Sequence, residues 1–223
     1  KKKKIGKNIK TKGNAGQEIY RDYSDSVVLV GTDGCKYIGT GFVIKHLGKK
    51  VITNWHVIED AKSIGIWLKP KKIVDADYLC RNQDSYVGKI VKINRKKDLA
   101  MIDVVGLPGN IKTISLGSTK SLNVGETVHA IGHPKGLTWS YSDGRVSQFR
   151  ANYRWAYDSN SRHEAKLVIQ TTTDISSGNS GGPLFNKHKK LIGVMTYTQP
   201  DGQGLNFAVS TEDLIEFMNE VQK

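Results

Sequence analysis

Short apolar segments rich in β-branched residues recur along almost the whole chain, separated by glycine, asparagine or aspartate. Segments of this length and spacing favour antiparallel strands in a sandwich or barrel over the alternating strands and helices of a parallel sheet. The chain is therefore predicted to be all-β. The expected strands are 27–30, 37–44, 51–53, 64–68, 73–79, 86–93 and 99–105, then 111–116, 127–132, 137–149, 165–171, 183–185, 191–198 and 205–209.

A break in this pattern at Leu107-Pro108-Gly109-Asn110 separates two halves of similar texture. One helix is well signalled near the end of the chain, because Ser210-Thr211-Glu212-Asp213 resembles a capping box and apolar residues follow at helical spacing. We expect this helix to pack on the second half. The predicted division is a flexible basic tail over 1–22, a first β unit over 23–108, a second over 109–210 and the helix over 211–223.

The 223 residues include 34 lysines and arginines against 21 acidic residues, a formal net charge of +13. Most of the excess consists of lysine pairs, which are typical of solvated loops and strand ends. Lys1–Lys4 form a denser group, for which we expect weak contact with a polyanion or an anionic surface. No motif predicts specific nucleic-acid binding, and no apolar run approaches the roughly 18 residues that cross a bilayer.

The two cysteines, Cys35 and Cys80, lie far apart in the sequence. They form one disulfide if the protein is exported or stay as two buried thiols, and the sequence leaves both readings open. No cysteine or histidine spacing matches a zinc site, so neither a metal ion nor a cofactor is expected. Aromatic and arginine residues are interleaved over 148–166, which we interpret as a long exposed loop at the substrate side or at a subunit contact.

The segment Gly178-Asn179-Ser180-Gly181-Gly182-Pro183 sets a serine among glycines. Taken alone it is a turn between strands or the setting of a nucleophile. A serine nucleophile needs a neighbouring base and amide donors aimed at the oxyanion that it creates. Gly178 lets the backbone bend so that its own N–H and that of Ser180 converge.

A base and a carboxylate are available on the first half. Among six histidines, His56 follows an apolar strand at a polar corner, which places its ring on the rim of the first β unit. Asp98 lies between a basic run and the strand at 99–105, at the mouth of that strand, and Asp103 is the reserve candidate. A serine, an imidazole and a carboxylate are the parts of a hydrolytic triad.

These segments together resemble the trypsin-like serine proteases of the chymotrypsin fold, and most closely the bacterial HtrA/Deg branch. The resemblance implies two antiparallel six-stranded β-barrels with the active site in the crevice between them. The residues that carry it are Gly39–Ile44, Val51–Val57, Asp98–Ala100, Ile131–Pro134, Gly144–Ser147, Gly178–Leu184 and Leu205–Val209.

The resemblance also implies roles. His56 serves as general base, Asp98 orients it, and Ser180 attacks the peptide bond, while Gly178, Asn179 and Ser180 form the oxyanion hole. Residues 196–198 pair with an extended peptide. The full expected substrate-binding set is Asp174, Ile175, Ser176, Ser177, Thr196, Tyr197, Thr198 and Asn206.

Three features depart from the digestive or HtrA relatives. Asn179 replaces the aspartate that pairs with a newly cut N-terminus, so no zymogen cleavage is expected. The chain stops after one helix where HtrA proteins continue into a PDZ domain, which indicates a PDZ-less relative or an excised protease domain. Asp174 occupies the position that selects arginine or lysine in trypsin, whereas HtrA relatives favour small aliphatic residues. Both specificities remain open.

The sequence thus predicts a serine endopeptidase acting on polypeptides through an acyl-enzyme. The alternatives are a catalytically latent homologue and a basic polyanion-binding module. The HtrA resemblance further implies a homo-oligomer, a trimer in that branch, and location in a bacterial periplasm or cell envelope or outside the cell.

Overall fold

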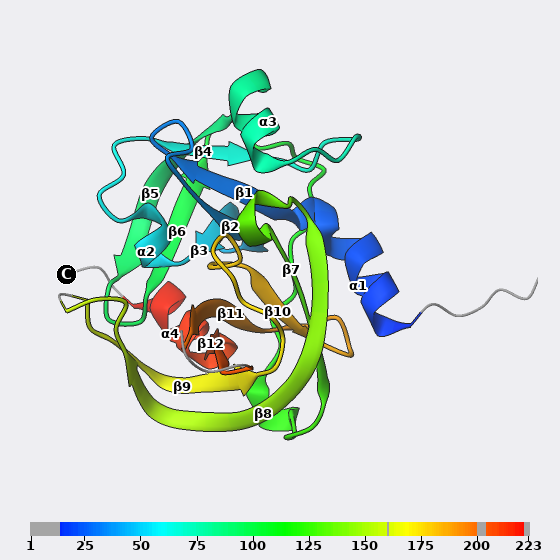
Figure 1. The fold of residues 1–223 in the computed structure, drawn as a ribbon, viewed down its shortest axis with the longest axis vertical. Coiled ribbons are helices and arrows are strands. Elements are labelled where there is room, and N and C mark those ends of the chain that lie inside the picture. The colour runs from blue at the N-terminus through cyan, green and yellow to red at the C-terminus, as the bar shows by residue number, and fades with distance from the viewer. Residues whose placement is uncertain (1–13, 160, 200–203, 221–223) are drawn as a thin grey trace, which may run out of the picture.

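The structure, a computed structural model, describes residues 14–159, 161–199 and 204–220. Two antiparallel six-stranded sheets each close into a barrel, as predicted (Figure 1). In spatial order the first contains β1 (Val27–Thr32), β2 (Tyr37–Lys45), β3 (Lys49–Thr53), β6 (Leu99–Val104), β5 (Tyr86–Asn94) and β4 (Ile64–Trp67). The second contains β10 (Pro183–Asn186), β11 (Leu191–Thr198), β12 (Asn206–Ser210), β9 (His163–Thr171), β8 (Ser140–Trp155) and β7 (Thr127–Gly132).

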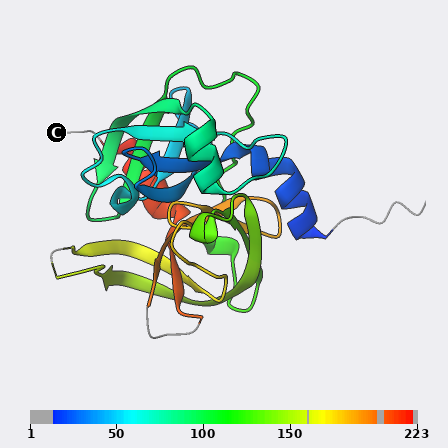
Figure 2. The ribbon, with the colours of Figure 1, turned by 45° about the horizontal axis from the view of Figure 1, so that its top comes forward.

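Both faces of the central strands are buried. In β1, Val28 and Val30 belong to the apolar cluster of the first barrel, whereas Val27 and Leu29 belong to a cluster that includes Phe185 of the second. This alternation follows from the period of two along a strand. The two barrels therefore share a core between them, and Figure 2 shows them one above the other.

The prediction of a flexible tail over 1–22 was wrong for residues 15–22, because these eight residues belong to helix α1 (Ala15–Tyr23). Asn14 and Gln17 form a capping box at its start. Ile19 is completely buried, and the Tyr20 hydroxyl donates to the Trp139 carbonyl at 3.0 Å. Docking on the second barrel supplies the stability that a short polar helix lacks alone. Lys1–Lys4 lie outside the described residues.

Two strand predictions were also wrong. Residues 73–79 lead into helix α3 (Ala76–Asn82), because the Asp75 side chain caps the Tyr78 N–H and Leu79 is buried. Residues 111–116 run between the barrels and make only one bridge, from Leu116 to Leu191. The sequence left the state of the two cysteines open, and the structure shows Cys35 and Cys80 bonded in a disulfide.

The predicted loop over 148–166 is mostly sheet. β8 starts at Ser140 rather than residue 137 and continues to Trp155, and it pairs with β9 from His163 onward. A long antiparallel hairpin therefore extends from the second barrel, and the described residues 156–159 and 161–162 belong to the connection between its strands.

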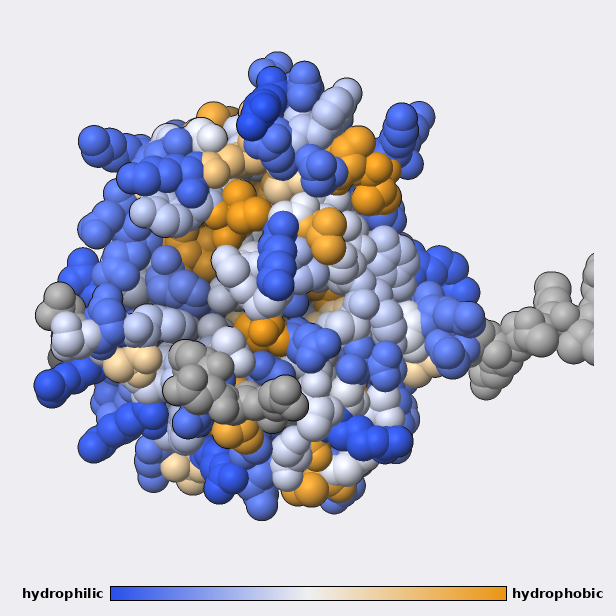
Figure 3. All heavy atoms as spheres, in the orientation of Figure 1, coloured by the Kyte–Doolittle hydropathy of each residue, from blue (hydrophilic) through white to orange (hydrophobic). Residues whose placement is uncertain are grey.

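Helix α4 (Thr211–Asn219) confirms the C-terminal helix, with the Ser210 side chain capping the Asp213 N–H. Leu214 and Phe217 are buried against the shared core. Lys97 of the first barrel forms ion pairs with the carboxylates of α4 and its C-terminal end, so this helix also links the two barrels. None of the described helices is long and apolar enough to cross a membrane. Polar residues dominate the face in Figure 3, and apolar residues form separate patches on it.

Candidate active site

A cleft of about 1120 Å³ lies between the barrels and takes residues from both. Its walls bring together the loop before β10, the end of β11, the β8–β9 connection and the short helix α2 (Trp55–Ile58). The predicted residues that line it are His56, Ile175, Ser176, Ser177, Gly178, Ser180, Thr196, Tyr197 and Thr198.

His56 and Asp98 are held together by their own backbones. Asp98 comes directly before β6, with a left-handed φ of 55°, and its carbonyl accepts the Trp55 N–H and the Asn54 side chain. Its Oδ1 accepts the His56 N–H at 2.9 Å, and its Oδ2 lies 2.8 Å from His56 Nδ1. The imidazole is therefore oriented through Nδ1, which leaves Nε2 for the cleft. Asp103, the reserve candidate, pairs with Lys50 instead.

Asp98 is completely buried, and the second barrel supplies two more donors to it. Thr196 Oγ1 donates to Oδ2 at 2.7 Å and the Tyr157 hydroxyl donates to the same oxygen at 2.8 Å. Burial alone raises the pKa of Asp98, but the adjacent His56 ring and the hydrogen bonds from His56 and Thr196 outweigh it and lower the pKa overall. The carboxylate is therefore ionised at neutral pH.

Ser180 is fixed against the first barrel, because its carbonyl accepts the Thr40 N–H at 2.9 Å. Its Oγ lies 3.5 Å from the Thr196 carbonyl oxygen, a long contact. The structure brings Ser180 and His56 to one cleft but records no hydrogen bond between hydroxyl and imidazole. Such contacts commonly tighten only when substrate is bound.

Two backbone N–H groups at and near the serine are free to donate. Within the described part of the chain, neither the Gly178 nor the Ser180 N–H has an acceptor. The Ser177 carbonyl accepts the Lys135 N–H at 2.6 Å, which turns the Gly178 N–H the opposite way. Including Asn179 in the oxyanion hole was wrong, because its N–H already donates to the Ser176 carbonyl at 2.9 Å.

Two expected substrate residues lie outside the cleft. Asp174 has an exposed side chain and is absent from the cleft lining, because Asn179 bonds its carbonyl and the loop turns its carboxylate to solvent. Asn206 is buried in β12, where it pairs with Thr198 and Thr171. Thr196 reaches the cleft, but its side chain faces Asp98.

Sequence reasoning missed Tyr157 and the contact of Thr196 with Asp98. Tyr157 stood within the aromatic and arginine segment, and no local signal distinguishes it from Tyr153 four residues earlier. Among the described residues, no group of three or more histidine, cysteine or acidic side chains is arranged to hold a metal ion.

A family model described as a trypsin-like peptidase domain matches residues 39–194. The "Probable periplasmic serine endoprotease DegP-like" of Pseudomonas putida is 33% identical over 190 residues, which cover 83% of this chain and 35% of that protein. The "Serine protease HtrA-like" of Staphylococcus aureus is 26% identical over 192 residues, covering 83% and 23%. The chain thus spans about a third or less of these curated relatives.

A solved structure agrees with these sequence matches. Deg5 superposes with a TM-score of 0.70 at 29% identity, covering 91% of each chain. The chain therefore belongs to the trypsin-like peptidase family and is similar to serine proteases named DegP-like and HtrA-like.

Proposed function

We propose that the protein is an endopeptidase that cleaves polypeptides with His56, Asp98 and Ser180 as its catalytic triad. The observation that carries the proposal is the buried Asp98 carboxylate, which fixes the His56 ring at the wall that also presents Ser180. An ionised carboxylate on Nδ1 sets the tautomer in which Nε2 accepts a proton.

The reaction follows from these positions. The Ser180 hydroxyl leaves its long contact with Thr196, gives its proton to His56 Nε2, and attacks the peptide carbonyl carbon. The oxyanion that forms accepts hydrogen bonds from the free N–H groups of Gly178 and Ser180. His56 then protonates the leaving amine, and a water molecule repeats the sequence on the acyl-enzyme.

The substrate binds as an added strand at the end of β11. The pairing of β10 with β11 ends at Val194. The same edge of β11 is therefore free of β10 at residues 196–198, which line the cleft. Ile175 both packs on the apolar cluster of the second barrel and lines the cleft. With Asp174 turned to solvent, we propose a preference for small apolar residues on the acyl side of the cleaved bond.

No cleavage at the N-terminus is required for activity. The side chain of Asn179 is a neutral amide, and its Nδ2 donates to the Asp174 carbonyl at 3.2 Å. It therefore cannot form the ion pair that a new amino terminus makes with an aspartate. The disulfide favours an oxidising compartment, in agreement with the periplasmic name of the Pseudomonas relative. Homo-oligomer formation stays a prediction.

Labelling with a fluorophosphonate tests the proposal. The wild-type protein should be labelled, and Ser180→Ala and His56→Ala should lose labelling while keeping the wild-type circular dichroism spectrum. Ser121→Ala, at an exposed serine outside the cleft, is the control and should be labelled. Equal labelling of Ser180→Ala and the wild type would refute the assignment of the nucleophile.

A further inference from the structure

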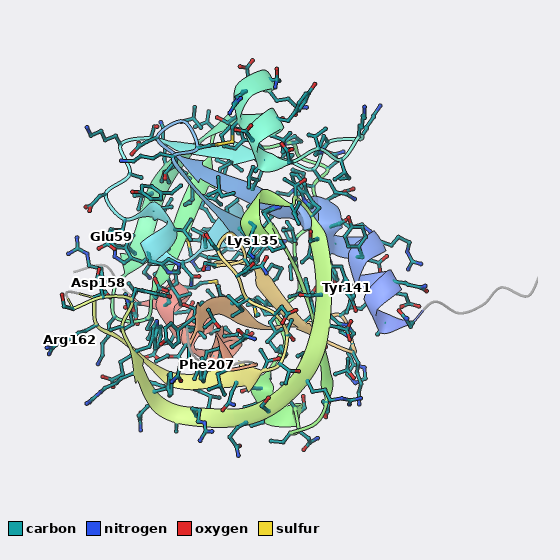
Figure 4. The ribbon with its side chains drawn as sticks, in the orientation of Figure 1. Glu59, Lys135, Tyr141, Asp158, Arg162 and Phe207 are labelled. Atoms are coloured by element: carbon teal, nitrogen blue, oxygen red, sulfur yellow. A yellow bond between two sulfur atoms is a disulfide. The ribbon has the colours of Figure 1, made fainter. Side chains whose placement is uncertain are left out.

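The loop that carries Asp98 is clamped by the β8–β9 hairpin of the other barrel. The Glu164 N–H donates to the Lys96 carbonyl at 2.6 Å, and His163 Nδ1 lies 2.8 Å from the Arg95 carbonyl oxygen. Figure 4 shows Asp158 and Arg162 at the end of this hairpin, with Asp158 on the side of Glu59 of the first barrel. The hairpin thus contacts the residues directly before the triad carboxylate.

One side chain of this hairpin reaches the carboxylate itself. The Tyr157 hydroxyl donates to Asp98 Oδ2 at 2.8 Å and lies 3.0 Å from the Thr196 carbonyl oxygen. The Tyr157 ring lies against the His56 imidazole, with centroids 4.4 Å apart and an interplanar angle of 46°. Edge-on contacts with His163 and Tyr197 fix the ring on its other sides.

The phenol acts only as a donor here. Tyr157 as a whole is 39% exposed, but its hydroxyl lies inward. Burial of that hydroxyl together with the nearby Asp98 charge raises the pKa of Tyr157 well above its ordinary value, so the hydroxyl keeps its proton. A hydrogen bond to a buried carboxylate is charge-assisted and stronger than one between neutral groups. Because three donors converge on Oδ2, the carboxylate has one favoured orientation, the one that aligns His56.

The backbone at Tyr157 is itself held in place. The Ser161 hydroxyl accepts the N–H groups of Tyr157 at 2.7 Å and of Asp158 at 3.0 Å. Asp158 Oδ1 in turn accepts the Ser161 N–H at 2.7 Å. The loop therefore presents the phenol to Asp98 from a closed turn.

We propose that Tyr157 is a positioning residue of the active site, through which the β8–β9 hairpin of the second barrel holds the Asp98–His56 pair of the first in its working geometry. It acts through Asp98 and not on the substrate. The inference rests on the proposed triad, and it adds to the site a side chain from a segment that the sequence presents as a loop.

The test compares Tyr157→Phe with Tyr153→Phe. Each variant loses one hydroxyl from the same hairpin, and the Tyr153 ring stacks on Phe207, with centroids 4.8 Å apart, rather than on His56. The rate of inactivation by a fluorophosphonate is measured against probe concentration, which separates the maximal rate constant from the half-saturating concentration. The resonance of the His56 Nδ1 proton is recorded by NMR in the same proteins, at rest.

Tyr157→Phe should lower the maximal inactivation rate about tenfold or more, as expected for one lost hydrogen bond to a charged group. The half-saturating concentration should stay within about twofold, since the phenol does not bind the probe. The Nδ1 proton resonance should move away from its wild-type position. Tyr153→Phe should match the wild type in all three measurements.

A Tyr157→Phe rate within twofold of the wild type would overturn the proposal, as would an Nδ1 resonance at its wild-type position. Absence of labelling in the wild type would instead remove the proposed function. The NMR measurement needs no activity, so it still decides whether Tyr157 orients the Asp98–His56 pair.

Discussion

Acidification should weaken the fold through His133, which lies behind the oxyanion loop. Its side chain is completely buried, its Nδ1 accepts the Trp139 N–H at 3.0 Å, and its ring lies edge-on to Trp139 at 4.7 Å between centroids. Burial lowers the pKa of His133 from 6.5 to about 4. The folded protein therefore holds His133 neutral in its interior.

The direction and the size of this pH effect on stability follow from proton linkage. Between pH 6.5 and about 4 the unfolded chain binds a proton at this position that the folded protein does not bind. The free energy of unfolding therefore falls as the pH is lowered through this window, and the His133 contribution levels off below it. At roughly 1.4 kcal/mol per pH unit, the total loss is about 3 kcal/mol, most of it between pH 7 and 4.5.

Urea unfolding at several pH values between 7 and 4.5 measures this loss. His133→Asn places an amide oxygen where Nδ1 accepts the Trp139 N–H, so the variant should fold and lose about 2 kcal/mol less than the wild type over the same range. His188→Asn, at an exposed histidine, should follow the wild type. The reasoning is refuted if His133→Asn shows the same pH dependence as the wild type.

Three further changes have expected outcomes. Gly178→Ala should abolish fluorophosphonate labelling with the circular dichroism spectrum retained, because φ is +98° and the added Cβ would lie 2.1 Å from the His133 carbonyl oxygen; normal labelling would contradict the loop geometry. Replacing Cys35 and Cys80 by serine removes a link across 45 residues and should lower the free energy of unfolding in urea by about 2–4 kcal/mol; an unchanged midpoint would contradict this. Asp174→Asn should leave cleavage-site preference in a peptide library unchanged, and a selective loss of cleavage after arginine or lysine would restore the trypsin-like specificity.

The barrels were predictable because their signal is local. Runs of β-branched apolar residues such as β1, and the glycine-rich turns between strands, can be recognised from neighbours in the sequence. Helix α1 was missed because its eventual stability depends on burying Ile19 against a distant surface. Helix α3 was read as a strand because Ile73 and Val74 favour one, while the Asp75 cap determines the outcome.

The proposed triad residues could be singled out for the same reason. His56, Asp98 and Ser180 each stand at a characteristic corner next to a strand, and the structure brings the first two into contact and the third to the same cleft. The orientation of Asp174 was not predictable, because the bend of its loop decides it. The contact of Tyr157 with Asp98 was not predictable either, because the lengths of β8 and β9 determine how far the hairpin extends toward the first barrel.

The fully buried Asp98 shows why this site requires both barrels. An ionised carboxylate out of contact with water is strongly destabilised unless partners compensate for the lost hydration. The first barrel contributes His56, and the second contributes Thr196 and Tyr157. When the two barrels pack together, the carboxylate therefore gains the hydrogen bonds that replace its lost hydration, and the cleft forms at the same time. A change that separates the β8–β9 hairpin from Asp98 should consequently reduce activity before it unfolds either barrel.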